Sequence, residues 1–259
     1  MTGDPTLNSY QGQPDRWPRK LCMLWSGGKD SFTAYSMAST ALGTSPSDWL
    51  FVTFVPSSGV FHCHPLGLLE RQSSALGVEH IFATVDKRDW AASYFRSFMC
   101  LRHHWAVERV FTGDILFGRS SVEGYWLLRM LEDVGMEIAL PLCGMYAGPL
   151  FDRMAEYGID AVITGVADWV DRPDLLGSKI SLELLHSSGL YLDPYVDLAG
   201  EQGEYHTSVV AAGGLHFVSS IDVLSSGRVM RTGGVDVPVM DPSLLNLSSP
   251  RMDLANEAN

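Results

Sequence analysis

Between Leu21 and Gly165, short apolar runs alternate with stretches of helical periodicity. The first run, Leu21–Trp25, ends at a pair of glycines, and the next stretch places apolar residues at i, i+3, i+4 and i+7, the spacing of one helix face. Strands that alternate with helices pair in parallel, because each helix returns the chain to the edge where the previous strand began. We therefore expect an α/β fold with a doubly wound, mostly parallel sheet and a smaller C-terminal α+β segment.

The boundaries of the expected elements follow from apolar runs, helical spacing and the glycines between them. The expected strands of the sheet are 21–25, 50–55, 80–85, 110–112, 137–142 and 161–164, and the expected helices lie around 34–41, 66–76, 91–98, 127–134 and 147–154. Beyond Gly165 we expect a helix at Leu182–Leu185 and a β-hairpin formed by His216–Val223 and Val229–Thr232. The expected division is a flexible tail (1–20), a nucleotide-binding domain (21–170), a smaller segment (171–237) and an irregular tail (238–259).

Composition excludes several classes of protein. The chain of 259 residues carries 18 basic and 30 acidic residues, a net charge of −12, and its basic residues do not cluster, which does not favour a nucleic-acid partner. No apolar run reaches the roughly 20 residues of a membrane helix, and the polar N-terminus has no signal-peptide core. The four cysteines form no CxxC pair, so neither a disulfide framework nor a paired-thiolate metal site is expected. These features predict a cytoplasmic protein. They leave the oligomeric state open, and a homo-oligomer is one of the alternatives.

The segment Ser26-Gly27-Gly28-Lys29-Asp30-Ser31 is the strongest chemical signal in the sequence. It stands between the first expected strand and the first expected helix. Two glycines allow a tight turn that presents backbone N–H groups, and the helix N-terminus and a lysine add positive charge. The segment is neither a Walker A loop nor a GxGxxG fingerprint. It predicts a polyphosphate-binding loop.

This SGGKDS segment resembles the PP-loop of the ATP pyrophosphatases. Three further segments resemble the diphthine–ammonia ligase family, in the form of its bacterial-type members: Val60-Phe61-His62 with the stretch 68–77, Gly113-Asp114-Ile115 with Pro141-Leu142, and the GEQGEYHT stretch 200–207. The resemblance covers about Leu21 to Phe217. It implies an adenine nucleotide alpha hydrolase-like fold and an ATP- and Mg²⁺-dependent ligase that adenylates a carboxylate, releases pyrophosphate and amidates the acyl group with ammonia.

The resemblance, together with position after a strand, gives the expected site. We expect catalytic roles for Lys29, Asp114, Glu201 and Glu204, and nucleotide binding by Ser26, Gly27, Gly28, Lys29, Asp30, Ser31, His62 and Gly113. Substrate binding is expected from Gln202, Gly203, Tyr205, His206 and Thr207, and Mg²⁺ binding from Asp30 and Glu201. The pair Glu201 and Glu204, spaced i, i+3 between glycines, is expected to face one site, where it holds either Mg²⁺ or the acceptor and ammonia.

Two departures from the family pattern bear on the acceptor. Cys143 stands where the family usually has tryptophan, and Ala199 stands where a cysteine is common. The bacterial-type pattern also leaves open an acceptor other than diphthine, such as a small-molecule carboxylate. Two other functions stay open: sulfur transfer to tRNA, which would call for a basic face and paired cysteines, and a non-catalytic nucleotide sensor, which would not need the GEQGEYHT segment.

Overall fold

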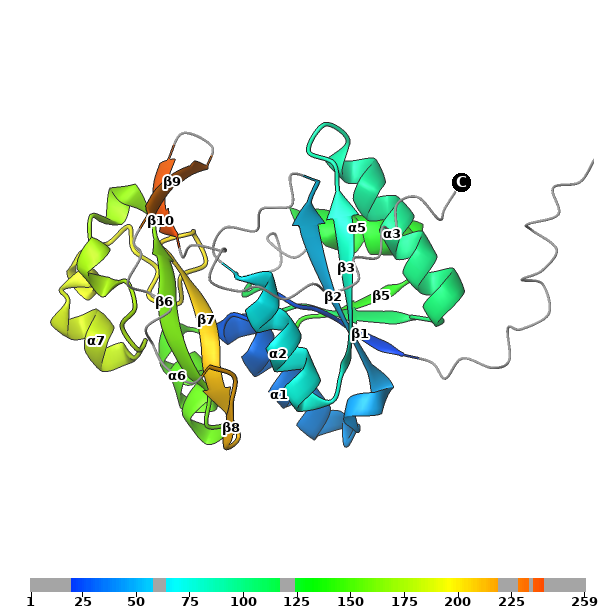
Figure 1. Cartoon of the computed structure of the whole chain (residues 1–259), viewed down its shortest axis with the longest axis horizontal. Coiled ribbons are helices and arrows are strands. Elements are labelled where there is room, and N and C mark those ends of the chain that lie inside the picture. The colour runs from blue at the N-terminus through cyan, green and yellow to red at the C-terminus, as the bar shows by residue number, and fades with distance from the viewer. Residues whose placement is uncertain (1–19, 58–63, 117–123, 219–227, 233–234, 240–259) are drawn as a thin grey trace, which may run out of the picture.

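Five strands form a parallel sheet in the order β3-β2-β1-β4-β5 (Figure 1). The structure is a computed structural model, and it describes residues 20–57, 64–116, 124–218, 228–232 and 235–239. The strands are β1 (Leu21–Leu24), β2 (Trp49–Pro56), β3 (Glu79–Val85), β4 (Arg109–Phe111) and β5 (Glu137–Ala139). The expected α/β class is confirmed, and the first five expected strands are present with their ends shifted by one to three residues.

Helices cover both faces of the parallel sheet, because successive strand residues point to opposite faces. Met23 packs in one core cluster with side chains of α1 and α2, whereas its neighbour Cys22 packs in a second cluster with side chains of α3 and α5. These helices are α1 (Lys29–Leu42), α2 (Leu66–Leu76), α3 (Trp90–Trp105) and α5 (Trp126–Asp133). None of the helices that the structure describes has the length and apolar character needed to cross a membrane.

The sixth expected strand belongs to a different sheet. β6 (Asp160–Val166) pairs antiparallel with β7 (Tyr205–Ala212), which pairs with β8 (Leu215–His216). The expectation of a sixth parallel strand was wrong because an apolar run indicates a buried strand without indicating its partner. The partner here lies about forty residues further along, so the expected division at residues 170 and 171 falls between two strands of one sheet.

Two further pairings involve the C-terminal strands. β9 (Arg228–Thr232) pairs with β10 (Val235–Val239), and β8 pairs with β7. Residues 219–223 of the expected hairpin strand His216–Val223 lie outside the described residues. The expected tails, 1–20 and 238–259, lie outside the described residues except for Lys20, Pro238 and Val239. The remaining elements are α6 (Ala147–Glu156), the expected helix α7 (Leu182–Ser187) and four single turns, η1 (Pro46–Asp48), η2 (Asp168–Val170), η3 (Pro173–Leu175) and η4 (Leu190–Leu192).

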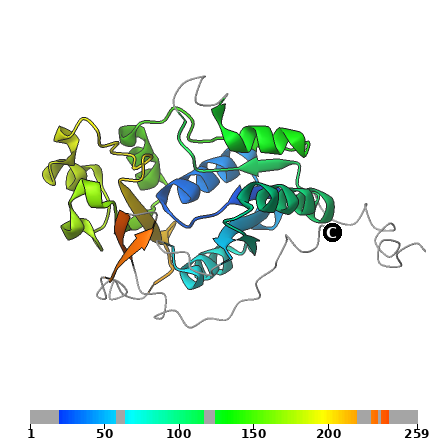
Figure 2. The same cartoon turned by 90° about the horizontal axis from the view of Figure 1, so that it is seen from above.

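Helices α1 and α2 lie between the parallel sheet and the β6-β7-β8 sheet, as both views show (Figure 1, Figure 2). α1 contacts β7 and α6, and the rings of Phe32 and Phe217 lie 5.5 Å apart. The backbone N–H of Val209 in β7 donates to the carbonyl oxygen of Gly27, 2.9 Å away. One apolar core therefore spans both sheets, and it ties β7 to the turn between β1 and α1.

Candidate functional site

The strand order reverses beside β1, the position where open α/β sheets bind ligands. β2 and β3 lie to one side of β1, and β4 and β5 lie to the other. The turn after β1 carries the expected phosphate-binding loop, and the turn after β4 carries Gly113 and Asp114. A Cβ atom added to Gly113 would lie 2.6 Å from backbone atoms of Asp30 and Ser31. The two turns, more than eighty residues apart in sequence, are therefore in direct contact, as their placement after parallel strands predicts.

The loop from Ser26 to Gly28 is shaped by its glycines. Gly27 has φ +69°, and an added Cβ would lie 2.2 Å from Leu69 and 2.4 Å from Gln72. Gly28 is the N-cap of α1 and supplies no side-chain cap. Ser31 donates to the carbonyl oxygen of Gly28, so its hydroxyl stays at the loop. This conformation is the expected one for a loop whose N–H groups and helix N-terminus take an anion.

Gln72 of α2 holds the loop in place, a role that the sequence did not reveal. Its fully buried amide donates to the carbonyl oxygens of Gly27 (3.0 Å) and Val209 (2.8 Å). Its Oε1 accepts from the indole N–H of Trp25 at 3.2 Å. One side chain thus joins β1, the loop, α2 and β7. It falls inside a stretch used for the resemblance, but its buried position was not evident from sequence.

Lys29 is buried, with 2% of its surface exposed. Its ammonium donates to both carboxylate oxygens of Asp30 at 2.8 Å and to the carbonyl oxygen of Ala199 at 2.5 Å, and it lies 5.3 Å from the ring centre of Tyr205. Its backbone N–H donates to Thr207. Lys29 therefore places a positive charge beside the loop and links it to the segment around 199–207.

A cavity of about 370 Å³ opens at this edge of the sheet, and we call it the edge cavity. It is lined by the loop, by the end of β1, the middle of β2, the turn after β4 and the first residues of α5. Three acidic side chains line it: Asp30, Asp114 and Glu201. The cavity thus combines an anion-binding loop with a concentration of negative charge.

Two of these carboxyl groups, Glu201 and Asp30, have raised pKa values. Burial raises the pKa of Glu201 to about 7, with repulsion from Asp30 and Asp114 adding to the effect, while the N–H of Ile115, 2.9 Å from Oε2, and Lys29 oppose it. Burial also raises the pKa of Asp30, and Lys29 counteracts this. A carboxyl with a pKa near 7 exchanges a proton at neutral pH, which is what a general base requires.

Asp114 is held by two hydroxyl groups. Thr112 and Tyr125 both donate to its Oδ2. Burial and the charge of Asp114 raise the pKa of Tyr125, so its phenol remains a donor. Tyr125 was not singled out from the sequence, although it precedes the helix that follows the fourth strand, the position where site residues were expected.

The GEQGEYHT stretch divides into two groups. Among its residues, only Glu201 lines the edge cavity. Glu204 is fully buried and accepts from two backbone N–H groups, those of Asp197 (2.7 Å) and Gln202 (2.9 Å). The expectation that Glu201 and Glu204 face one site was therefore wrong, because both Glu204 oxygens accept hydrogen bonds from the backbone of their own loop. A Glu204→Gln change would remove one of those acceptors and so would not isolate the effect of charge.

The expected substrate-binding residues are likewise spread out. Tyr205 and Thr207 are buried and bonded to Leu198 and Lys29, respectively. Gln202, Gly203 and His206 are exposed, and the His206 ring lies 5.8 Å from that of His64. His62, an expected nucleotide contact, lies outside the described residues.

The donor set of the edge cavity suits Mg²⁺, which prefers oxygen ligands and is often held by one or two carboxylates together with substrate phosphates. Within the residues that the structure describes, no three His, Cys, Asp or Glu side chains form a ready metal cluster. A site completed by phosphate oxygens does not need one. Asp30 and Glu201 remain the expected ligands.

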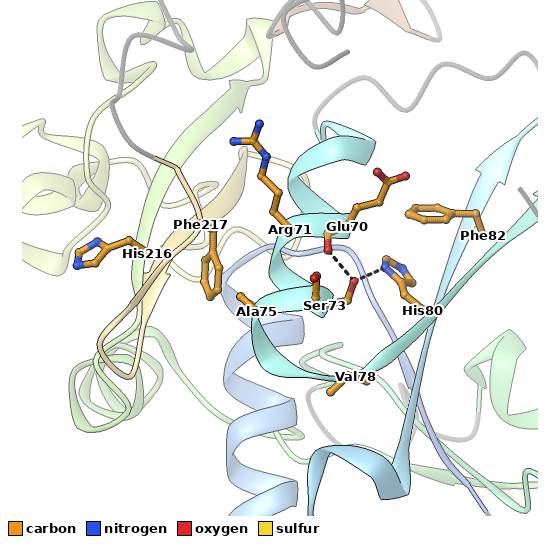
Figure 3. A pocket seen from close by; sticks show the side chains of 10 residues that line it. Glu70, Arg71, Ser73, Ala75, Val78, His80, Phe82, His216 and Phe217 are labelled. Atoms are coloured by element: carbon orange, nitrogen blue, oxygen red, sulfur yellow. Dashed lines mark hydrogen bonds between the residues drawn. The ribbon is translucent and has the colours of Figure 1, made fainter. Parts of the chain in front are cut away.

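A larger hollow, of about 670 Å³, lies between α2, β3 and β8 (Figure 3). Its central group, His80, is paired on both ring nitrogens, with Thr53 at 2.8 Å and Ser73 at 3.2 Å. Burial lowers the pKa of His80 to about 3, so it is neutral. The hollow reaches the first half of β3, away from the carboxyl edge where the conserved geometry of such sheets places ligands. We therefore assign the site to the edge cavity.

Comparisons with known proteins add little to this geometry. The sequence matches no protein-family model and no curated protein. Among solved structures, the U34-tRNA thiolase NcsA from Methanococcus maripaludis, with its [4Fe-4S] cluster, covers 76% of this chain and 74% of its own, at 10% identity and a TM-score of 0.35. A likeness this weak carries no argument about activity.

The raised pKa of Glu201 leads to a prediction about stability. The folded state binds this proton more tightly than the unfolded state, so the carboxyl costs stability as pH rises from about 4.5 through 7. We expect Glu201→Gln to match the wild type near pH 5 and to be more stable by about 2 kcal/mol at pH 8, a value reduced for partial exposure. Urea unfolding at both pH values measures it. An equal difference at the two pH values would contradict the assigned pKa.

Proposed function

We propose that this chain is an ATP-dependent ligase that forms AMP and pyrophosphate. It adenylates a carboxylate acceptor and amidates it with ammonia, as the resemblance to diphthine–ammonia ligases implies. The observation that carries the proposal is the contact between the Ser26–Ser31 loop and the Gly113–Asp114 turn. Glu201, which accepts from the N–H of Ile115 beside that turn, adds a carboxyl group of pKa near 7 to the same cavity, whose size suits a nucleotide.

The loop has the task of holding the leaving group. Its N–H groups, the N-terminus of α1 and the charge of Lys29 stabilise the β- and γ-phosphates, which leave as pyrophosphate when an acceptor oxygen attacks the α-phosphate. Mg²⁺, held by Asp30 and Glu201 or by the phosphates alone, would neutralise charge on the departing pyrophosphate. This assignment requires no movement of the glycine turn, which Gln72 fixes.

The second half-reaction, the attack of ammonia on the acyl adenylate, needs a proton acceptor. Ammonia attacks the acyl carbon of the adenylate, AMP leaves with the bonding electrons, and the nitrogen gives up a proton. Glu201 is positioned to accept that proton, because burial and neighbouring carboxylates bring its pKa close to neutral. Asp114, oriented by Thr112 and Tyr125, is proposed to orient ammonium in the cavity. The partners are thus ATP, ammonia and a carboxylate, in the cytoplasm.

Product analysis tests this proposal. We expect ATP, Mg²⁺, ¹⁵N-ammonium and a panel of carboxylates to yield AMP and pyrophosphate in equal amounts, with ¹⁵N in a new amide detected by NMR. ADP growing with turnover would contradict the reaction class. AMP and pyrophosphate without ¹⁵N incorporation would favour the sulfur-transfer alternative, and ATP binding without turnover would favour the sensor.

Glu201→Gln serves as the matched variant for the same assay. If Glu201 accepts the proton, the variant binds ATP but forms amide slowly, and the rise of wild-type rate through pH 7 disappears. If Glu201 mainly holds Mg²⁺, the variant instead shows weaker ATP affinity that excess Mg²⁺ restores. Wild-type behaviour on both counts would remove Glu201 from the mechanism.

A further inference from the structure

Three aromatic side chains cluster at the edge cavity: Trp90, Tyr94 and Trp126, which we call the rim aromatics. Trp90 is the first residue of α3 and Trp126 the first of α5. Both helices follow strands of the parallel sheet, so their first turns stand at its carboxyl edge. Tyr94 and Trp126 line the cavity itself, and Trp90 contacts both of them.

Two of the rim aromatics, Trp90 and Trp126, are exposed, whereas Tyr94 is half-buried. Trp90 is 48% exposed and Trp126 is 41% exposed. Large aromatic side chains are normally well covered, and contiguous exposed apolar surface usually marks a binding site. Other side chains of α3 and α5, such as Phe98 and Leu127, are buried in the core, so the two tryptophans stand exposed at the first residue of each helix.

The rings stand nearly perpendicular to one another. The interplanar angle is 87° between Trp90 and Trp126, 77° between Trp90 and Tyr94, and 76° between Tyr94 and Trp126, with centroids 5.1–6.2 Å apart. Edge-to-face packing leaves ring faces available to a third ring, which can stack on one face and meet the edge of a neighbour. Such a surface favours a flat aromatic group over an aliphatic chain of equal size.

The edge cavity is large enough for one nucleotide, so the rim aromatics are available to the second reactant, the acceptor. A volume of about 370 Å³ is near the lower end of the roughly 300–1,000 Å³ typical of small-molecule sites, so one nucleotide would fill it. The acceptor must still reach the α-phosphate, and the rim aromatics lie beside the cavity that would hold that phosphate. We propose that the rim aromatics bind the acceptor, and that the acceptor is a planar aromatic carboxylic acid; this rests on the proposed function.

A binding experiment tests the proposal with a pair of probes of one carbon skeleton. 2-Naphthoate and its saturated counterpart, decahydro-2-naphthoate, are titrated calorimetrically into the full chain saturated with Mg²⁺ and α,β-methylene-ATP, which cannot be cleaved between its α- and β-phosphates. We expect the flat probe to bind roughly two- to twelvefold more tightly, the range expected for aromatic stacking. Equal affinities, or no binding of either probe, would overturn the proposal.

Variants locate the interaction. Trp126→Leu and Trp90→Leu are each expected to remove the preference for the flat probe. Trp169→Leu is the matched control, because Trp169 is equally exposed (49%) but does not line the cavity. Retention of the preference in both rim variants would overturn the assignment.

Two other occupants are distinguished in the same experiment. If 2-naphthoate binds the nucleotide-free chain and α,β-methylene-ATP displaces it, the rim binds adenine and the proposal is wrong. If a single-stranded oligouridylate binds in a Trp126-dependent manner while 2-naphthoate does not, the rim binds nucleic acid and the proposal is again wrong. Each of these experiments measures binding and does not depend on turnover. Amide formation on aliphatic acids alone would overturn this inference and leave the proposed function intact.

Discussion

Replacing Gly27 with alanine is expected to abolish nucleotide binding and to lower the free energy of unfolding by roughly 3 kcal/mol. Two effects add at this position. The φ of +69° disfavours any residue with a Cβ, and that Cβ would lie 2.2 Å from Leu69 and 2.4 Å from Gln72. Both neighbours are almost fully buried, so neither can move without disturbing the core. Urea unfolding and calorimetric titration with MgATP measure the two effects.

Two further glycine variants show whether the loop itself is responsible. Gly148→Ala lies in α6 with open space around the new Cβ, and it is expected to be neutral or slightly stabilising. Gly28→Ala is a milder probe of the loop, because its φ is ordinary and its Cβ would lie 2.9 Å from the carbonyl oxygen of Thr207. We expect Gly28→Ala to fold and to bind MgATP weakly. Wild-type affinity in that variant would show that phosphate binds elsewhere.

The position of this loop was predictable because two simple regularities combine. Apolar periodicity located β1 and α1, and parallel strands end at one edge, which predicts that the loop after β1 and the Gly113-Asp114 turn gather at that edge. The same reasoning failed for β6, since the periodicity of a strand says nothing about the direction of its partner. The partner, β7, belongs to the second sheet, and the backbone N–H of its Val209 donates to the carbonyl oxygen of Gly27.

The orientation of individual side chains was harder to predict. Glu201 and Glu204 belong to one short motif, yet one lines the edge cavity and the other bonds backbone N–H groups of its own loop. Spacing along a loop does not fix direction as helical spacing does. Gln72 illustrates a second limit: its partners are Trp25 and Gly27 in one turn and Val209 in a distant strand, so only the folded chain shows why an amide stands inside the core.

Lys29→Met is expected to lower the free energy of unfolding by about 3 kcal/mol at pH 8 and to prevent MgATP binding. The lysine ammonium is the group that balances Asp30, and its removal leaves that carboxylate beside Asp114 and Glu201. It also leaves the carbonyl oxygen of Ala199 without this donor. Methionine keeps the unbranched stem in the core, so the change isolates the ammonium.

The pH dependence of that loss identifies its cause. Burial already raises the pKa of Asp30 against the opposing effect of Lys29, so removal of the lysine raises that pKa further. A carboxyl whose pKa is raised in the folded state costs stability as pH rises, and the defect of Lys29→Met should therefore be smaller at pH 5 than at pH 8. The double variant Lys29→Met/Asp30→Asn is expected to recover most of the stability at pH 8 while still failing to bind MgATP. An equal defect at both pH values, with no recovery in the double variant, would mean that Lys29 stabilises the fold through Ala199 and not by balancing the acidic side chains of the edge cavity.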